Sequence, residues 1–248
     1  MSLISVYSLI PNPIVSYNNK IGDLESIKVM EPKNLVHPDS SCLVFFTGGS
    51  SIIFPDIYSN FLNKLANKNI SIYTPSFNYK NVGELINELN KDYKEVILAG
   101  HSSGCSLALK NSNNENLKKL ILFDPVKTDL LNQDLYELRN LNSILFLNAM
   151  KSYKFNLFPP AIPFVPEFVS IKKDDLDLND DCDIITCKAM AYGHCDILNK
   201  EFSDKMHEAR IAIGNKNRDK ENLDKYQDWL VTSVDSYLNN KNIKKKKY

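Results

Sequence analysis

The stretch Leu98-Ala-Gly-His-Ser-Ser-Gly-Cys-Ser106, LAGHSSGCS, joins two segments of different hydrophobic periodicity. Residues 95–99 before the turn form a short apolar run typical of a buried strand, whereas residues 103–111 have helical spacing. The turn Gly100-His101-Ser102-Ser103-Gly104 therefore lies between a strand and a helix. Because a turn this sharp strains the backbone at its centre, the glycines on either side are expected to let strand and helix approach each other.

Strand-like apolar runs alternate with helical stretches along the rest of the chain. Continuous apolar strands between amphipathic helices predict a mostly parallel, doubly wound α/β sheet with helices on both faces. The expected strands are 43–46, 70–73, 96–99, 120–123, 144–147 and 184–190, and the expected helices are 57–68, 82–91, 103–111, 129–140 and 220–238. Weaker alternating runs at 4–9, 14–17 and 25–30 fit an antiparallel N-terminal edge.

Composition excludes several classes of function. The 248 residues fit a single domain, 1–248, and the 30 basic and 30 acidic residues cancel, so no nucleic-acid partner is expected. The five cysteines contain no CxxC pair, so we expect reduced thiols and neither a disulfide framework nor a metal site. With no basic n-region and no long apolar stretch, we expect a cytoplasmic protein without stable membrane insertion and a solvated basic tail at 241–248. No feature specifies an oligomeric state.

Residues 151–181 break the alternation with a run rich in proline and phenylalanine, followed by an acidic cluster. Proline removes backbone donors and disfavours helix in the residue before it, so the segment is expected to be a loop. Long loops in compact domains are often functional. We therefore expect it near the active site, although a packed excursion without a ligand is the alternative. The side chains expected to line a substrate are Phe155, Phe158, Pro160 and Phe164.

Ser102 is the predicted nucleophile, because G-x-S-x-G between a strand and a helix is typical of a nucleophile elbow. A serine hydroxyl needs a general base, and the chain contains four histidines. His101 is expected to pack beneath the turn, His37 precedes the first parallel strand, and His207 lies in a polar helical stretch. His194 remains, in a glycine-containing loop directly after the last apolar strand, and is the predicted base.

Asp124 is the predicted acid because it ends strand 120–123, at the edge of a parallel sheet where ligands bind. The segment after the next strand, 150–158, contains no carboxylate. Asp196 is too close in sequence to His194 to orient it and is expected to cap a helix instead. The less favoured alternatives are Asp129, Asp174, Asp175 and Asp177.

Donors for an oxyanion are expected where the first parallel strand ends, in Thr47-Gly48-Gly49-Ser50. The backbone N–H of Gly49 or Ser50 would pair with that of Ser103, the residue after the nucleophile. Five of the eight glycines lie in the three loops that carry the predicted oxyanion donors, nucleophile and base. This chemistry requires no metal and no cofactor.

The order of these motifs resembles the chlorophyllase group of the α/β-hydrolases. The resemblance rests on GHSSG, Phe123-Asp124-Pro125-Val126, Asn156-Leu157-Phe158-Pro159-Pro160 and Tyr192-Gly193-His194-Cys195-Asp196-Ile197-Leu198, and it spans about residues 40–200. It implies hydrolysis of the phytyl ester of chlorophyll. Ser103 and Cys105 replace the arginine and second glycine usual in that family, and Thr47-Gly48-Gly49 replaces its usual His-Gly-Phe.

The expected function is therefore hydrolysis of a carboxylic ester by a Ser-Asp-His triad, with a large apolar ester as substrate. A general carboxylesterase or lipase acting on acyl lipids is the alternative. A non-catalytic ligand-binding protein of the same fold is less expected, because the three triad residues are all present.

Overall fold

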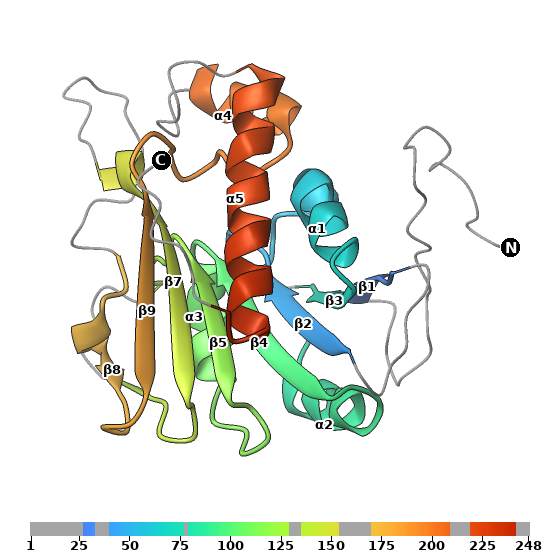
Figure 1. The fold of residues 1–248 in the computed structure, drawn as a ribbon, viewed down its shortest axis with the longest axis vertical. Helices are drawn as coiled ribbons and strands as arrows, with labels where there is room; N and C mark the ends of the chain where they lie inside the picture. Colours follow the sequence, from blue (N-terminus) through green and yellow to red (C-terminus); the bar gives the residue numbers. More distant parts are fainter. Residues whose placement is uncertain are drawn as a thin grey trace, which may run out of the picture.

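Seven strands form one sheet in the order β1-β3-β2-β4-β5-β7-β9 (Figure 1). The computed structural model describes residues 27–32, 40–76, 79–128, 135–153, 170–208 and 219–241. Neighbouring strands are parallel except β1 and β3, which pair antiparallel. The strands are β1 (Ile27–Met30), β2 (Ser41–Phe46), β3 (Ile70–Pro75), β4 (Glu95–His101), β5 (Lys119–Phe123), β7 (Ser143–Ala149) and β9 (Asp183–Ala189). The predicted parallel sheet with an antiparallel N-terminal edge is confirmed.

Helices cover both faces of this sheet. In Figure 1, α1 (Ser59–Ala66) and α5 (Lys220–Leu238) lie in front of the strands, while α2 (Val82–Asp92) and α3 (Gly104–Lys110) lie behind them. A shorter helix, α4 (Lys200–Glu208), lies near the upper end of α5. This strand order, with a tight turn between β4 and α3, is the α/β-hydrolase fold.

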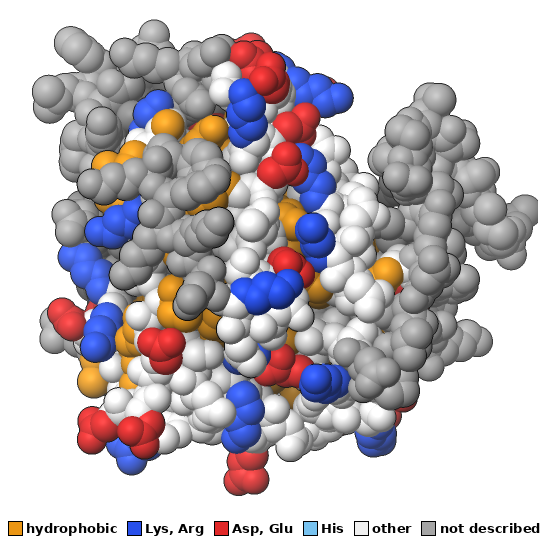
Figure 2. Space-filling model, in the orientation of Figure 1, with side chains coloured by type: hydrophobic (Ala, Val, Ile, Leu, Met, Phe, Trp, Pro, Cys, Tyr) orange, Lys and Arg blue, Asp and Glu red, His pale blue; other side chains and the backbone are white. Residues whose placement is uncertain are grey.

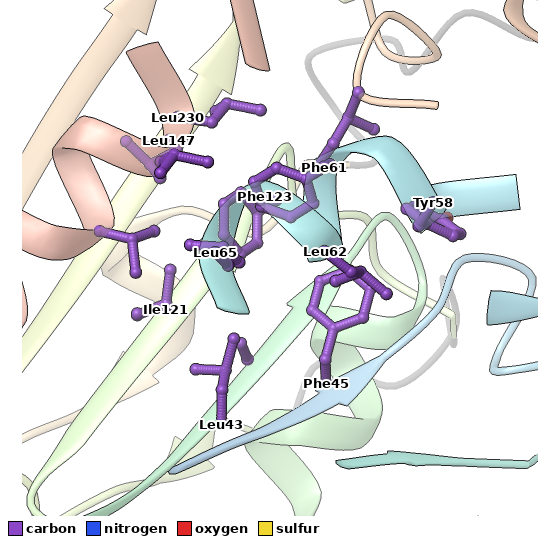
Figure 3. Packing of buried hydrophobic residues seen from close by; sticks show 14 of the residues in the cluster. Leu43, Phe45, Tyr58, Phe61, Leu62, Leu65, Ile121, Phe123, Leu147 and Leu230 are labelled. Atoms are coloured by element: carbon purple, nitrogen blue, oxygen red, sulfur yellow. The ribbon is translucent and has the colours of Figure 1, made fainter. Parts of the chain in front are cut away.

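Side chains along β2 point alternately to the two faces of the sheet, which explains why helices must cover both faces. Leu43 and Phe45 belong to the core under α1 and α5, whereas Cys42 and Val44 belong to the core under α2 and α3. Figure 3 shows Phe45 close to the aromatic and aliphatic side chains of α1. Full burial of each such side chain contributes about 1.5–3 kcal/mol, so the strand is stable only between two helical layers.

The last helix begins and ends as the sequence predicts. Asp219 caps it by accepting a hydrogen bond from the Asn222 N–H at 2.7 Å. The apolar stripe that includes Leu223, Tyr226 and Leu230 is buried against the sheet. On the face seen in Figure 2, basic and acidic side chains are interspersed along this helix and beside it.

The predicted helix at 129–140 is wrong for the part that the structure describes. Tyr136–Glu137 form strand β6, which pairs parallel with β8 (Leu176–Asp177) in a small second sheet. Leu138 is buried, and its N–H donates to the Asp177 carbonyl at 2.8 Å. Tyr136, Glu137 and Leu138 alternate inward and outward, so a short period of two was misread as a helical period.

Several predictions fall on residues outside the described ranges. These include Phe155, Phe158, Pro160 and Phe164 in the segment 151–181, as well as residues 4–17 and 242–248. The described ends of the long segment contain two short 3-10 helices, η4 (Met150–Tyr153) and η6 (Lys173–Asp175). Within the described ranges, no helix combines the length and the apolar character needed to cross a membrane.

Candidate active site

Ser102 lies at the tip of the turn between β4 and α3 and has a left-handed backbone, with φ of 57°. Its N–H donates to the Phe123 carbonyl at 3.0 Å, and its own carbonyl accepts from the Cys105 N–H at 3.1 Å. A left-handed conformation costs a non-glycine residue about 1–2 kcal/mol, so the surrounding hydrogen bonds must hold it. Strain of this kind is common at functional residues.

The two flanking glycines are required by close approach of the backbone. A Cβ on Gly104 would lie 2.3 Å from the Phe46 carbonyl oxygen, and one on Gly100 would lie 2.5 Å from the Gly104 carbonyl carbon. Neither distance is tolerable for a methyl group. The spacing of glycines in the turn therefore has the physical cause expected from the sequence.

His194 lies in the base loop, residues 190–198 after β9, and contacts both Ser102 and Asp124. Its Nε2 is 2.7 Å from Ser102 Oγ, and its Nδ1 is 2.5 Å from Asp124 Oδ2. An ionised carboxylate only accepts, so Nδ1–H donates to Asp124 and Nε2 accepts the Ser102 hydroxyl proton. The structure thus brings together the three residues predicted as nucleophile, base and acid.

Asp124 is only 2% exposed and is held by groups from the end of β7. The Ala149 N–H donates to Oδ1 at 3.1 Å, and the Ser152 hydroxyl donates to Oδ2 at 2.7 Å. Ser152 was not predicted from the sequence. The signal in the sequence was its position, since Ser152 is a small hydroxyl residue just after the strand that neighbours the one ending at Asp124. In the prediction, that segment counted only because it contains no carboxylate.

The alternative acids have other contacts. Asp175 forms an ion pair with Lys127, Asp177 forms one with Arg139, and Asp174 is exposed. Asp129 lies outside the described residues. Asp196 accepts the Gly193 N–H at 2.9 Å, within the base loop itself.

The loop after β2, residues 47–51, is here called the oxyanion loop and contains three successive left-handed residues. The φ angles are 60° at Gly49, 53° at Ser50 and 66° at Ser51. The Ser50 N–H donates to the Ser103 side-chain hydroxyl at 2.8 Å. Within the described part of the chain, the N–H groups of Gly49 and Ser103 form no hydrogen bond. Of the two pairs left open by the sequence, Gly49 with Ser103 is the one with uncommitted donors.

The other histidines do not contact Ser102 Oγ within the described ranges. His101 is buried beneath the turn, as expected, with Nδ1 2.8 Å from the Tyr58 hydroxyl and Nε2 3.0 Å from the His194 carbonyl oxygen. Burial, with the neighbouring His194, holds the pKa of His101 well below its usual value. His207 is exposed on α4, as expected, and His37 lies outside the described residues.

Cys105, one of the two positions at which the turn between β4 and α3 departs from the resembled family, does not face the site. It is fully buried, and its thiol donates to the Gly100 carbonyl at 2.9 Å. Burial raises the pKa of this thiol well above its usual value. Of these two positions, Ser103 is the one in contact with the oxyanion loop, through its hydrogen bond with Ser50.

Comparison with known proteins gives structural resemblance only. No family model and no curated protein matches the chain. Among solved structures, it resembles an arylesterase (13% identity, 71% of this chain and 77% of that one, TM-score 0.47). It also resembles Thermogutta terrifontis esterase 2 (13%, 81% and 93%, TM-score 0.46) and the esterase domain of a Rhodothermus marinus protein (10%, 75% and 89%, TM-score 0.45).

Proposed function

We propose that this protein hydrolyses carboxylic esters, with Ser102 as nucleophile, His194 as general base and Asp124 as the acid that orients the base. One observation carries the proposal: hydrogen bonds run from Ser102 Oγ through both ring nitrogens of His194 to Asp124 Oδ2, at 2.7 Å and 2.5 Å. A serine hydroxyl becomes an effective nucleophile when a base lies within reach and a third group fixes that base.

The reaction proceeds by two acyl transfers. Ser102 Oγ bonds to the ester carbonyl carbon while His194 Nε2 takes the hydroxyl proton, and the carbonyl electron pair moves onto oxygen. When this oxyanion collapses, the bond to the alcohol oxygen breaks and the alcohol leaves with the proton from Nε2. Water then attacks the acyl-enzyme with the same base, which releases the acid and restores Ser102. Asp124 stabilises the imidazolium in both halves.

The developing oxyanion requires fixed donors close to Ser102. The N–H groups of Gly49 and Ser103 are uncommitted within the described part of the chain, which supports their assignment as the pair. Loss of one such donor costs roughly 10²–10³ in kcat in serine hydrolases. The strained oxyanion loop is consistent with a backbone shaped for this contact.

The substrate we propose is a large apolar ester, such as the phytyl ester of chlorophyll. Ile52 and Phe54 follow the oxyanion loop and are 64% and 73% exposed, and Met190 at the start of the base loop is 51% exposed. An apolar side chain that is exposed to water gains free energy when an apolar ligand covers it. These side chains lie beside or within the oxyanion loop and the base loop in the sequence, which supports an apolar substrate. The same observation supports acyl lipids as strongly as it supports the phytyl ester.

Parallel assays test both parts of the proposal, which are ester hydrolysis and a large apolar ester as the substrate. Purified protein is incubated with chlorophyll and with short- and long-chain p-nitrophenyl esters, and the products are separated by chromatography. Ser102→Ala should abolish turnover and labelling by a fluorophosphonate probe while leaving the circular dichroism spectrum unchanged. A folded wild-type protein that neither labels nor turns over any ester would reject the proposal in favour of a ligand-binding role.

A further inference from the structure

We propose that Tyr58 and His101 are positioning residues that tie the oxyanion loop to the base loop. The inference rests on the proposed function, because it concerns how the oxyanion donors and the general base are held relative to each other. Tyr58 ends the 3-10 helix η3 (Pro55–Tyr58), and His101 is the last residue of β4. Neither residue contacts Ser102 Oγ or Asp124 through a hydrogen bond within the described residues.

A continuous series of hydrogen bonds connects the two loops. The Gly48 N–H in the oxyanion loop donates to the Tyr58 hydroxyl oxygen at 3.0 Å. The same oxygen lies 2.8 Å from His101 Nδ1, and His101 Nε2 lies 3.0 Å from the backbone carbonyl oxygen of His194. Three bonds therefore join two loops whose linked residues lie far apart in the sequence.

The direction of every proton in the series follows from its ends. The His194 carbonyl can only accept, so His101 must carry its proton on Nε2 and donate it there. A neutral imidazole then accepts at Nδ1, which requires the Tyr58 hydroxyl to donate to His101. The Tyr58 oxygen remains free to accept from the Gly48 N–H. In this arrangement every donor and acceptor in the series is satisfied.

Burial makes the series rigid. Tyr58 and His101 are both buried, and an unmade hydrogen bond in such a place is costly. Figure 3 shows Tyr58 at the margin of the aromatic cluster, where its ring packs edge-on against Phe45 with centroids 5.4 Å apart. The rings of His101 and His194 lie 4.7 Å apart, centroid to centroid. A neutral His101 therefore avoids repulsion with the imidazolium that His194 becomes during the reaction.

Gly48 is tightly enclosed at the start of this series, so a larger residue would push its neighbours by a few tenths of an ångström. A Cβ there would lie 3.0 Å from the Tyr58 hydroxyl oxygen and 3.4 Å from His101 Nδ1. The glycine thus lets the tyrosine hydroxyl reach the backbone. The next residue, Gly49, carries the proposed oxyanion donor, so a shift of the Gly48 amide displaces that donor directly.

Tyr58→Phe tests the proposal by removing one hydroxyl while the ring stays in place. We expect kcat for a p-nitrophenyl ester to fall about 10- to 100-fold and KM to change less than about threefold, because displacing reacting groups by about 1 Å costs rates of this order. Tyr73→Phe is the matched control. Its hydroxyl is bonded to that of Tyr93 at 2.9 Å on the opposite face of the sheet, so kcat should be retained despite a loss of stability.

Nitrogen-15 NMR of the imidazoles supplies a readout that does not depend on turnover. In the wild type, His101 should show the Nε2–H tautomer, and Tyr58→Phe should shift the resonances of His101 Nδ1, the Gly48 amide and the His194 ring together. Unchanged kcat in Tyr58→Phe, an equal loss in Tyr73→Phe, or an Nδ1–H tautomer of His101 would overturn the inference. If the wild type hydrolyses no ester, the proposed function fails, and the NMR shifts alone still decide whether the loops are linked.

Discussion

The Asp124 carboxylate holds His194 from a strand end that is itself anchored by the neighbouring strand. His194 Nδ1 lies 2.5 Å from Asp124 Oδ2, and the same carboxylate accepts from the Ala149 N–H and the Ser152 hydroxyl. Three donors around one buried carboxylate fix its orientation more firmly than its own side-chain torsions would. Because the carboxylate is fixed, its hydrogen bond to Nδ1 also fixes the His194 ring, and Nε2 points at Ser102.

Asp124→Asn should lower kcat by about 10⁴-fold with little change in fold, because an amide cannot hold the imidazole in the required tautomer and cannot stabilise its charge. Steady-state kinetics with a p-nitrophenyl ester provide the measurement. Asp175→Asn is the matched control, since Asp175 pairs with Lys127 and not with His194. If Asp175→Asn were the damaging variant, the assignment of the acid would be wrong.

Ser152→Ala should lower kcat about 10-fold, because a hydrogen bond to a charged group is worth about 1.5–3 kcal/mol and part of that supports the orientation of Asp124. Ser112→Ala is a suitable comparison: Ser112 is also buried, but its hydroxyl donates to the Ala108 carbonyl at the far end of α3. Equal kcat in both variants would show that Ser152 contributes to stability alone.

The sequence predicted the sheet well because its strands are buried on both faces and therefore appear as continuous apolar runs. All six predicted parallel strands are present, within a few residues at each end. Triad candidates could be placed for a related reason: parallel strands bring their carboxyl ends to one edge, so Ser102, Asp124 and His194 converge once the order is known.

Local patterns failed where a short segment is held by distant partners. The 129–140 stretch has apolar residues compatible with two periods, and pairing of Tyr136–Glu137 with β8 decides between them. Ser152 and Tyr58 act through single hydroxyl groups whose partners lie 28 and 43 residues away. Nothing in the spacing of such residues distinguishes them from ordinary serines and tyrosines.

Ser103→Ala should lower kcat about 10-fold, since the Ser103 hydroxyl is the acceptor that ties the strained Ser50 to the turn at 2.8 Å. Without it, a loop with three left-handed residues is free to relax toward ordinary backbone angles. Ser103→Thr keeps the hydroxyl and should restore most of kcat. A rise in kcat for Ser103→Ala would instead indicate that the released Ser50 N–H is the better oxyanion donor.

Gly104→Ala should destabilise the fold by about 3 kcal/mol or more, because the new methyl would lie 2.3 Å from the Phe46 carbonyl oxygen. Urea denaturation followed by circular dichroism measures the change. Gly83→Ala serves as the control: its Cβ meets nothing within 4 Å in α2, and alanine should stabilise that helix by up to about 1 kcal/mol. Similar destabilisation of both variants would contradict the packing argument.

Acid should destabilise the protein partly through His101. Burial holds the pKa of His101 well below its usual value near 6.5, so below about pH 6.5 the unfolded chain binds a proton that the folded chain excludes. Stability contributed by this residue is therefore present above that pH and falls by up to about 1.4 kcal/mol per pH unit as the pH decreases toward the folded-state pKa. Urea denaturation between pH 5 and 7.5 measures the slope.

His101→Gln removes the titrating group that faces Tyr58 and His194, so its slope should be shallower although its absolute stability is lower. An identical slope in both proteins would mean that other groups account for the acid sensitivity.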